Sequence, residues 1–532
     1  MIPKYITSMF PTSKVRLVIF VGSLAILLSM LYTNLARPST FIPILLKAMS
    51  STAVQPRPVI VVGSGLAGLS ASYEALKRGA PSVHLVDSAA KPGGNSIKAS
   101  SGINGAGTRF QRASGIERDD LFHSDTVRSA GAHFKSRDPP VDREGLVSKL
   151  TNESTAAVEW LTDEIGVDLS VVAALGGHSI ARTHRGAGKL PPGAAIVSAL
   201  LEKLKANDKF TLSSSARVTS VIGGSGEKGI LGVQYEVEGG QEKSLEGAVV
   251  FATGGFAGDA TGLLARYRPD LKGMPSTNDE RPGAHNILTA AGAELLDMDS
   301  VQIHPTGFVD PSNPSSKLKS LAAEMLRGHG AILLSPDGSR FVNELETRKH
   351  VSQAIMDLPP AVNTEDSDLK QWDVTILLDA GATKAAASHI GFYEWKGLLQ
   401  KVKVSELASN IKAVLHKYAS TIVAGGEDEF GRKNYGQWEL KPDDVEKDTD
   451  EQYVYIGRVT PIVHFTMGGV AIDKKARVLR RKDGELVPIQ GLFAAGEITG
   501  GIHGDNRLGG SSLLECVVFG RTAGAEAAMA GS

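Results

Sequence analysis

The chain has 532 residues, which is long enough for two or three domains and excludes a single small binding module. Hydrophobic residues make up 42% and charged residues 22%, as in ordinary globular proteins with a large core. The net charge of −1 excludes an overall basic field, so we expect no nucleic-acid partner, and the 59 glycines indicate many specific turns.

The N-terminal stretch contains basic residues but no acidic residue before Glu74. Between Arg16 and Arg37 lie the uncharged residues 17–36, which as a helix would reach across about 30 Å of hydrocarbon. We therefore expect a targeting segment or transmembrane helix that brings the chain into contact with a membrane. A cleaved secretory signal, an anchor trimmed after import and a leader upstream of a start at Met49 are the alternatives. Because the basic residues keep the N-terminus cytosolic or on the matrix side, we expect the body of the chain in the mitochondrion (intermembrane space or inner membrane), the endoplasmic reticulum, or both.

The only cysteine is Cys516, so the sequence excludes an intrachain disulfide, a thiolate-held iron–sulfur cluster and a c-type haem site. Its neighbours in the apolar run 513–519 indicate a buried, inert thiol. No cluster of metal-ligating residues is evident in the sequence, and we expect no metal.

A nucleotide-binding pattern opens the folded part. Residues 59–62 (Val-Ile-Val-Val) predict a buried strand, and Gly63-Ser-Gly65-Leu-Ala-Gly68 follows it directly. Apolar residues at helical spacing come next, and then a second strand that ends in Asp87. In this Rossmann-like order the glycines let the backbone approach a pyrophosphate at the helix N-terminus, and Asp87 is placed to accept a hydrogen bond from a ribose hydroxyl.

Further glycine turns favour FAD over a nicotinamide dinucleotide. Gly93-Gly94-Asn95-Ser96 follows the second strand, and the turns at 253–255 and 496–497 each follow an apolar strand. Several close backbone approaches suit an extended ligand such as FAD, and no second dinucleotide fold is evident. We therefore expect one FAD per chain and no NAD(P)H site. The glycine cluster at 223–226 lies beside alternating strand patterns and predicts a hairpin turn.

Seven motifs occur in order from about Val59 to the end of the chain. They are the first glycine fingerprint, the 93–96 turn, Ala252-Thr253-Gly254-Gly255-Phe256, His304-Pro305-Thr306-Gly307, Arg340-Phe-Val-Asn343-Glu344, His464-Phe-Thr-Met467-Gly468-Gly469 and Asp505-Asn506-Arg507-Leu508-Gly509-Gly510. Together they resemble the flavoprotein of the fumarate reductase and succinate dehydrogenase family, and most closely the soluble fungal fumarate reductases. The resemblance implies an α/β fold in which a smaller α+β capping domain interrupts the Rossmann-like FAD-binding domain and closes the substrate between them.

The order of the motifs predicts the domain limits. We expect a leader over 1–57, the first part of the FAD-binding domain over 58–299, the cap over 300–461 and the return of the FAD-binding domain over 462–532. The acidic stretch from 359 to 451 predicts a largely solvated part of the cap.

The predicted FAD-binding residues lie in the glycine turns and at the ends of the strands that precede them. They are Gly63, Gly65, Leu66, Ala67, Gly68, Asp87, Ser88, Lys91, Gly93, Gly94, Asn95, Ser96, Ser100, Gly102, Thr253, Gly254, Glu497, Ser512 and Leu513.

A small dicarboxylate substrate needs several cationic or hydrogen-bond-donating groups beside the flavin, because a desolvated dianion is costly to bury. The resemblance makes His304, His464 and Arg507 the residues that bind the carboxylates. It implies that a hydride passes from N5 of reduced FAD to fumarate and that succinate is the product.

The resemblance also implies a catalytic set of His304, Glu324, Arg327 and Arg348. Glu324 and Arg327 have the i, i+3 spacing of one helical face, and in the related reductases the matching pair leads a proton to the residue that corresponds to Arg348, the acid. Arginine ordinarily stays protonated. An alternative therefore makes Arg348 an electrostatic clamp and leaves the proton to His304 or Arg327.

Two positions depart from the family pattern. Ser96-Ile97-Lys98 stands where respiratory members carry the histidine that attaches FAD, so we expect noncovalent FAD. Ala323 stands where bacterial soluble members have a threonine, which removes one hydrogen bond to a carboxylate. Aspartate, urocanate and 3-ketosteroid remain alternative substrates, and a noncatalytic flavin-binding role is a further alternative. Because the chain has no haem or iron–sulfur route, we expect a diffusible electron donor such as reduced free flavin.

Overall fold

The computed structural model describes residues 57–136, 138–188, 190–224, 229–362, 368–447 and 451–530. All the elements below belong to one compact unit. The predicted membrane helix at 17–36 lies outside the described residues, so it stays a prediction. Among the residues that are described, no helix is both long and apolar enough to cross a bilayer.

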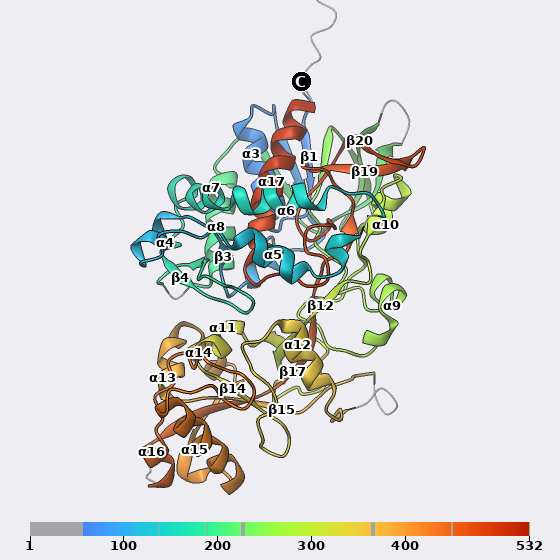
Figure 1. Cartoon of the computed structure of the whole chain (residues 1–532). Coiled ribbons are helices and arrows are strands. Elements are labelled where there is room, and N and C mark those ends of the chain that lie inside the picture. Colours follow the sequence, from blue (N-terminus) through green and yellow to red (C-terminus); the bar gives the residue numbers. More distant parts are fainter. Residues whose placement is uncertain are drawn as a thin grey trace, which may run out of the picture. The chain divides into compact units, whose positions relative to one another are not determined.

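A six-stranded sheet forms the centre of the FAD-binding domain (Figure 1). The strand order is β19-β20-β10-β1-β2-β6, in which β19 alone pairs antiparallel. The strands are β1 (Val59–Val62), β2 (Val83–Val86), β6 (Phe210–Ser213), β10 (Ala248–Phe251), β19 (Arg477–Lys482) and β20 (Glu485–Ala494). Every residue of β1 is buried, as expected of a β-branched strand inside a covered parallel sheet. This topology confirms the Rossmann-like core.

Two helices from opposite ends of the sequence pack against each other beside this sheet: α3 (Leu66–Lys77) and α17 (Ser511–Ala530) (Figure 1). Helix α3 begins directly after the glycine turn and ends before Gly79, whose φ of +90° suits glycine. An antiparallel meander of β7 (Ala216–Gly223), β8 (Ile230–Val237) and β9 (Glu242–Glu246) contacts β10 and β20. Strands β7 and β8 pair antiparallel up to Gly223 and Ile230, in keeping with the predicted hairpin, whose residues 225 and 226 lie outside the described residues.

The remaining elements of this domain are short. Three strands form a small sheet in the order β3-β5-β4: β3 (Ile103–Asn104), β5 (Thr183–Arg185) and β4 (Val171–Ala173). The helices are α4 (Arg109–Ala113), α5 (Phe122–Ala130), α6 (Arg143–Asn152), α7 (Ser154–Glu159), α8 (Pro192–Lys205), α9 (Leu263–Tyr267) and α10 (His285–Ala290), with β11 (Leu295–Leu296) paired to β18 (Gly469–Val470). Single helical turns of other types occur at Ser96–Lys98, His133–Lys135, Trp160–Ile165 and Pro269–Leu271.

The segment predicted as the cap contains a second, antiparallel six-stranded sheet, and we keep the name cap for it. Its order is β13-β12-β17-β15-β14, with β16 also paired to β17. The strands are β12 (Val301–Phe308), β13 (Ser320–Leu321), β14 (Ile332–Leu334), β15 (Val374–Leu378), β16 (Gln400–Lys403) and β17 (Tyr453–Thr466). The helices are α11 (Glu324–Gly328), α12 (Arg348–Met356), α13 (Ala380–Ala385), α14 (Ala387–Trp395), α15 (Ser409–Val423) and α16 (Pro442–Glu446), with a short turn at Val404–Glu406. The predicted domain limit at 461 falls inside β17.

Among its described residues the stretch from 359 to 451 is solvated in part: Glu427, Glu429 and Asp443 are exposed, as predicted, whereas one strand is buried. Trp372 and all but one residue of β15 are buried, because this strand lies between two others in the cap sheet. Asp379, directly after β15, is also buried, and its carboxylate accepts hydrogen bonds from the backbone of Ala382 and Leu440.

A bulge in β12 fixes the backbone beside the first active-site histidine. The register of β12 with β17 shifts between His304 and Gly307. Pro305 has no N–H to donate to the ladder, so it is tolerated at such an irregularity. Nδ1 of His304 then lies 3.1 Å from the carbonyl oxygen and 3.2 Å from the backbone nitrogen of Thr306, which holds the imidazole in place.

Candidate active site

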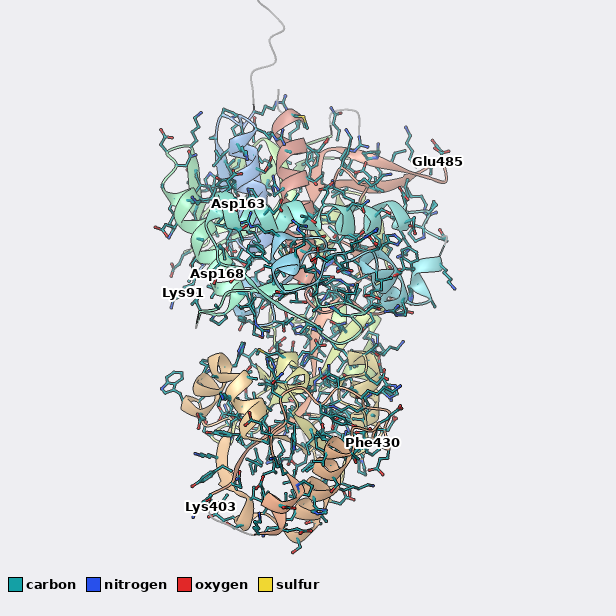
Figure 2. The ribbon with its side chains drawn as sticks, turned by 60° about the vertical axis from the view of Figure 1, so that its left-hand side comes forward. Lys91, Asp163, Asp168, Lys403, Phe430 and Glu485 are labelled. Atoms are coloured by element: carbon teal, nitrogen blue, oxygen red, sulfur yellow. The ribbon has the colours of Figure 1, made fainter. Side chains whose placement is uncertain are left out.

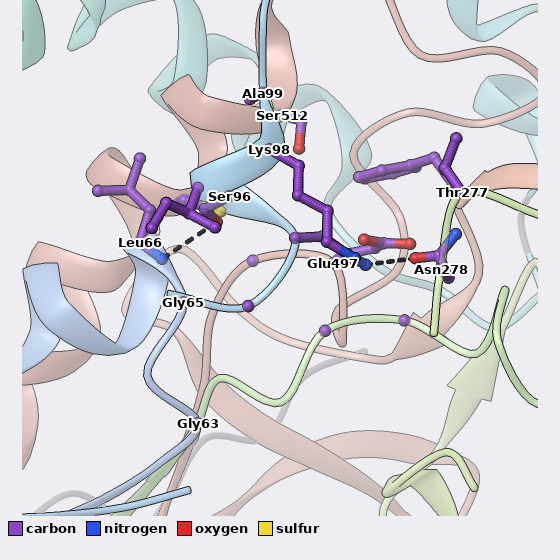
Figure 3. A pocket seen from close by; sticks show the side chains of 18 of the residues that line it. Gly63, Gly65, Leu66, Ser96, Lys98, Ala99, Thr277, Asn278, Glu497 and Ser512 are labelled. Atoms are coloured by element: carbon purple, nitrogen blue, oxygen red, sulfur yellow. Dashed lines mark hydrogen bonds between the residues drawn. The ribbon is translucent and has the colours of Figure 1, made fainter. Parts of the chain in front are cut away.

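The first glycine turn forms one wall of a large cavity (Figure 3). Gly63 has a φ of +103°, and a Cβ there would lie 2.4 Å from the carbonyl oxygen of Ala252. Only glycine therefore fits. The N–H of Leu66, at the start of α3, donates to Oγ of Ser96 at 3.1 Å, so the two predicted glycine turns are tied together (Figure 3).

Asp87 holds this glycine turn in place through hydrogen bonds. Its Oδ2 accepts hydrogen bonds from the backbone N–H of Ser64, at 2.7 Å, and from the Ser64 hydroxyl. Its Oδ1 accepts from the N–H of Ala89 at 2.7 Å. The carboxylate thus positions the loop that would receive the pyrophosphate, and the predicted ribose contact stays a prediction.

The cavity has a volume of about 1040 Å³. All but three of the predicted FAD-binding residues line it; the exceptions are Gly68, Lys91 and Gly93. A Cβ on Gly68 would lie 1.9 Å from the carbonyl oxygen of Gly63, so this glycine allows the helix to pack rather than contacting the cavity. Lys91 is exposed (labelled in Figure 2). The N–H of Gly93 donates to Oγ of Ser64, so Gly93 supports the turn.

The residues of this cavity fit FAD. The volume is at the upper end of ligand pockets, about 300–1000 Å³. Among the described residues, the buried hydroxyls of Ser100 and Thr253 have no hydrogen-bond partner and are free to meet a ligand. Burial raises the pKa of the Glu497 carboxyl to about 7, so that near neutral pH this side chain is available as a donor to a hydroxyl. Bound FAD would be held by the glycine turns and by these side chains.

At one side of the cavity Arg348 and Arg507 converge on Gln302. Nη1 of Arg348 donates to Oε1 of Gln302 at 2.8 Å, and Nη2 of Arg507 donates to the same oxygen at 3.1 Å. The guanidinium of Arg507 also lies over the ring of Phe465, 4.4 Å from its centroid. Two buried cations therefore face the cavity side by side, which suits a dianionic ligand.

Behind Arg348 lies the buried carboxylate of Glu324. Nε and Nη2 of Arg348 both donate to its Oε2, at 2.7 and 2.5 Å. Burial alone would raise the pKa of Glu324, but the charges of Arg348 and Arg327 outweigh burial and lower it to about 2. Arg327 is itself buried, and burial lowers its pKa to about 10. The predicted proton-path residues are thus brought together.

Two histidines complete this side. The rings of His304 and His464 lie 5.4 Å apart, edge to face. Burial, reinforced by the charge of Arg348, lowers the pKa of both well below the usual value. Both are therefore neutral hydrogen-bonding groups at neutral pH. Nδ1 of His304 lies against the backbone of Thr306, and its Nε2 has no partner among the described residues.

The predicted site residues do not all reach the cavity. Arg348, His464 and Arg507 line it, whereas His304, Glu324 and Arg327 are buried beside or behind them. Cys516 lines the cavity but is buried, which raises the pKa of its thiol, in keeping with the predicted inert role. Among the described residues no group of side chains is placed to hold a metal ion.

Two functional residues were not predicted from sequence. Gln302, which joins the two arginines, stands two residues before His304 on the same strand, and the period of two along a strand could have indicated it. Gly176 donates its backbone N–H to Oε1 of Glu324 at 2.9 Å. Nothing local in the sequence marks that contact.

The chain belongs to the family of FAD binding domains, which matches residues 58–513. Its relatives include fumarate reductases of fungi, as the motifs implied. It is 43% identical over 490 residues to fumarate reductase 1 of Saccharomyces cerevisiae, covering 88% of this chain and 97% of that one. It is 40% identical to the fumarate reductase of Schizosaccharomyces pombe, covering 87% and 88%.

Solved structures agree with this assignment. The open conformation of a flavocytochrome c3 fumarate reductase matches with a TM-score of 0.68 and 31% identity, over 93% of this chain and 82% of that one. A 3-ketosteroid dehydrogenase from Rhodococcus jostii RHA1 matches in fold alone, with a TM-score of 0.61 and 20% identity over 90% and 98% of the two chains.

Proposed function

We propose that this chain is a fumarate reductase that uses one noncovalently held FAD to convert fumarate to succinate. The observation that carries the proposal is the meeting of two buried arginines, Arg348 and Arg507, at one side of a cavity whose other walls fit FAD. A noncatalytic flavin-binding protein needs neither arginine.

The reaction adds a hydride to one alkene carbon of fumarate and a proton to the other. FAD, when bound and reduced, supplies the hydride. Arg507 and the neutral His464 hold the carboxylates, and negative charge that develops on the substrate is stabilised most by the cations already fixed around it. Because Arg348 and Arg507 are buried, water is kept from competing with the substrate for them.

Arg348 is the acid in this proposal. Of the three candidates, Arg348 lines the cavity, whereas His304 and Arg327 do not. Its contact with Glu324, which lies within the electrostatic reach of Arg327, gives a route by which the proton is replaced after transfer. The burial that lowers the pKa of Arg327 also favours proton movement along this chain of groups.

The donor and the location are part of the proposal. A diffusible reduced flavin would deliver electrons, since the single cysteine leaves no thiolate-held cluster. The uncharged segment 17–36 would target the chain to the mitochondrion or the endoplasmic reticulum. Fractionation of cells that express fluorescent fusions with and without residues 1–57 tests this. Membrane or organelle association should disappear in the shortened fusion.

The substrate is tested with purified protein, an anaerobic assay and chemically reduced FMN as donor. Fumarate, urocanate and a 3-ketosteroid are offered separately, and L-aspartate is tested as a reductant of the oxidised flavin. We expect fumarate alone to be consumed, with one succinate formed per reduced flavin oxidised. Turnover of another compound without fumarate would overturn the proposal.

A further inference from the structure

The loop between β4 and β5 reaches the proton-path carboxylate from outside the cap. Oε1 of Glu324 accepts the backbone N–H of Gly176 at 2.9 Å, while Oε2 accepts both hydrogen bonds from Arg348. Each carboxylate oxygen of Glu324 therefore bonds to a different partner, Oε1 to Gly176 and Oε2 to Arg348. The orientation of the carboxylate is therefore set by a group 148 residues away in the sequence.

This loop is held firmly in place. Asp125 is buried, and its Oδ2 accepts hydrogen bonds from the N–H of Ser179 at 2.9 Å and from Nη1 of Arg182 at 2.7 Å. His178 donates from Nε2 to the carbonyl oxygen of Gly509 at 3.0 Å. Since Gly509 follows Arg507 closely, the loop is tied to the segment that carries the substrate-facing arginine.

Glycine at position 176 leaves room for the Glu324 carboxylate, and the backbone conformation there does not itself require glycine. The φ of Gly176 lies outside the left-handed region that requires glycine, unlike that of Gly177 at +81°. A Cβ at Gly176 would nevertheless lie 2.7 Å from Oε1 of Glu324, too close for contact. The side chain of Glu324 would have to move, and the backbone would not.

We propose that the backbone N–H of Gly176 positions the Glu324 carboxylate for proton delivery to Arg348, so that the 174–182 loop acts as a positioning element for the cap. The proposal rests on the proposed function. Because donor and acceptor come from separate parts of the fold, any movement that parts them also interrupts the proton path.

Gly176→Ala tests this without changing any titratable group. We expect kcat for fumarate to fall about 10- to 100-fold, since a misplacement of about 1 Å in a reacting constellation costs on this scale. KM should change less than about threefold, and FAD content and the urea midpoint should match the wild type. Gly426→Ala is the control, because its Cβ would meet nothing within 4 Å and its φ also lies outside the left-handed region.

A double-mutant cycle shows whether Gly176 acts through Glu324. In a Glu324→Asp background the shortened carboxylate has already left Gly176, so Gly176→Ala should change kcat less than about twofold. Equal losses in both backgrounds, an unchanged kcat in the single variant, or loss of FAD would each overturn the inference. If the wild type itself leaves fumarate unreduced, the proposed function fails instead, and the same kcat comparison is made with the acceptor that the substrate panel identifies.

Discussion

Arg348 gives two of its hydrogen bonds to a single oxygen of Glu324, from Nε at 2.7 Å and from Nη2 at 2.5 Å, and its third to Gln302. All three guanidinium nitrogens are thus engaged, and the planar side chain is fixed at the edge of the cavity. An arginine held in this way is presented to the substrate in one orientation, which is what proton transfer to a defined carbon requires.

The variant Arg348→Lys distinguishes the two roles considered for Arg348, the proton-donating acid and the electrostatic clamp. A lysine ammonium cannot reproduce the planar fork that meets Glu324 and Gln302 together. We expect kcat to fall about 10²- to 10⁴-fold with KM nearly unchanged and FAD retained. Steady-state kinetics with Lys349→Ala as the exposed neighbouring control measures this. A raised KM with kcat preserved would support the clamp and remove Arg348 as the acid.

Gln302→Leu keeps the approximate volume of the side chain but removes the oxygen shared by Arg348 and Arg507. Both guanidinium groups lose a buried partner, which costs about 1–3 kcal/mol of stability. We expect kcat to fall and KM for fumarate to rise together, because one arginine serves proton transfer and the other binding. Gln353→Leu, on the exposed side of α12, is the control. Wild-type kinetics in Gln302→Leu would mean that the arginines are positioned without this bridge.

Glu497 predicts a pH dependence of stability. Burial raises its pKa from the ordinary 4.5 to about 7. An acid with a raised pKa in the folded state contributes stability that is full below about pH 4.5 and is lost as the pH rises to about 7, because the unfolded chain ionises first. The loss amounts to about 3 kcal/mol.

Glu497→Gln cannot ionise and should escape this loss. The free energies of unfolding of the FAD-free wild type and of the FAD-free variant are measured in urea at about pH 5 and about pH 8. The stability of the variant relative to the wild type should be greater at the higher pH than at the lower pH. Other titrating groups cancel in the difference, so a difference that is independent of pH would contradict the raised pKa.

Two glycines with the same strain distinguish a structural turn from a binding turn. Gly63 and Gly79 have φ of +103° and +90°, but a Cβ would clash with Ala252 only at Gly63. Gly79→Ala should cost about 1–2 kcal/mol and keep FAD. Gly63→Ala should cost at least about 3 kcal/mol and lose FAD, as measured by urea unfolding and by the flavin absorbance of the purified protein. Equal FAD content in the two variants would remove Gly63 from the FAD site.

The parts of the fold that the sequence predicts are those with local causes. The β1–α3–β2 unit was predictable because strand composition, helical spacing and the glycines at 63, 65 and 68 act over a few residues. The site residues came from motifs, and the structure brings them together. Lys91 was placed at the cofactor by proximity in sequence; it is exposed and does not line the cavity, and its contact with FAD stays a prediction.

The contacts that organise the site were not predictable. Gln302 meets Arg507 across 205 residues and Gly176 meets Glu324 across 148. These contacts depend on how the loop that carries Arg507 lies against β12 and on how the loop after β4 is anchored. The period of two along β12 could indicate Gln302 but not its partner 205 residues away, and a glycine whose function lies in its N–H looks like any other glycine.

The central claim, that reduced FAD in this protein passes its electrons to fumarate, is tested most directly by a single turnover. The bound flavin is reduced anaerobically, mixed with fumarate in a stopped-flow instrument, and followed by its absorbance. We predict full reoxidation and one succinate per flavin. A flavin that stays reduced with fumarate, yet is reoxidised by urocanate or a 3-ketosteroid, would contradict the account.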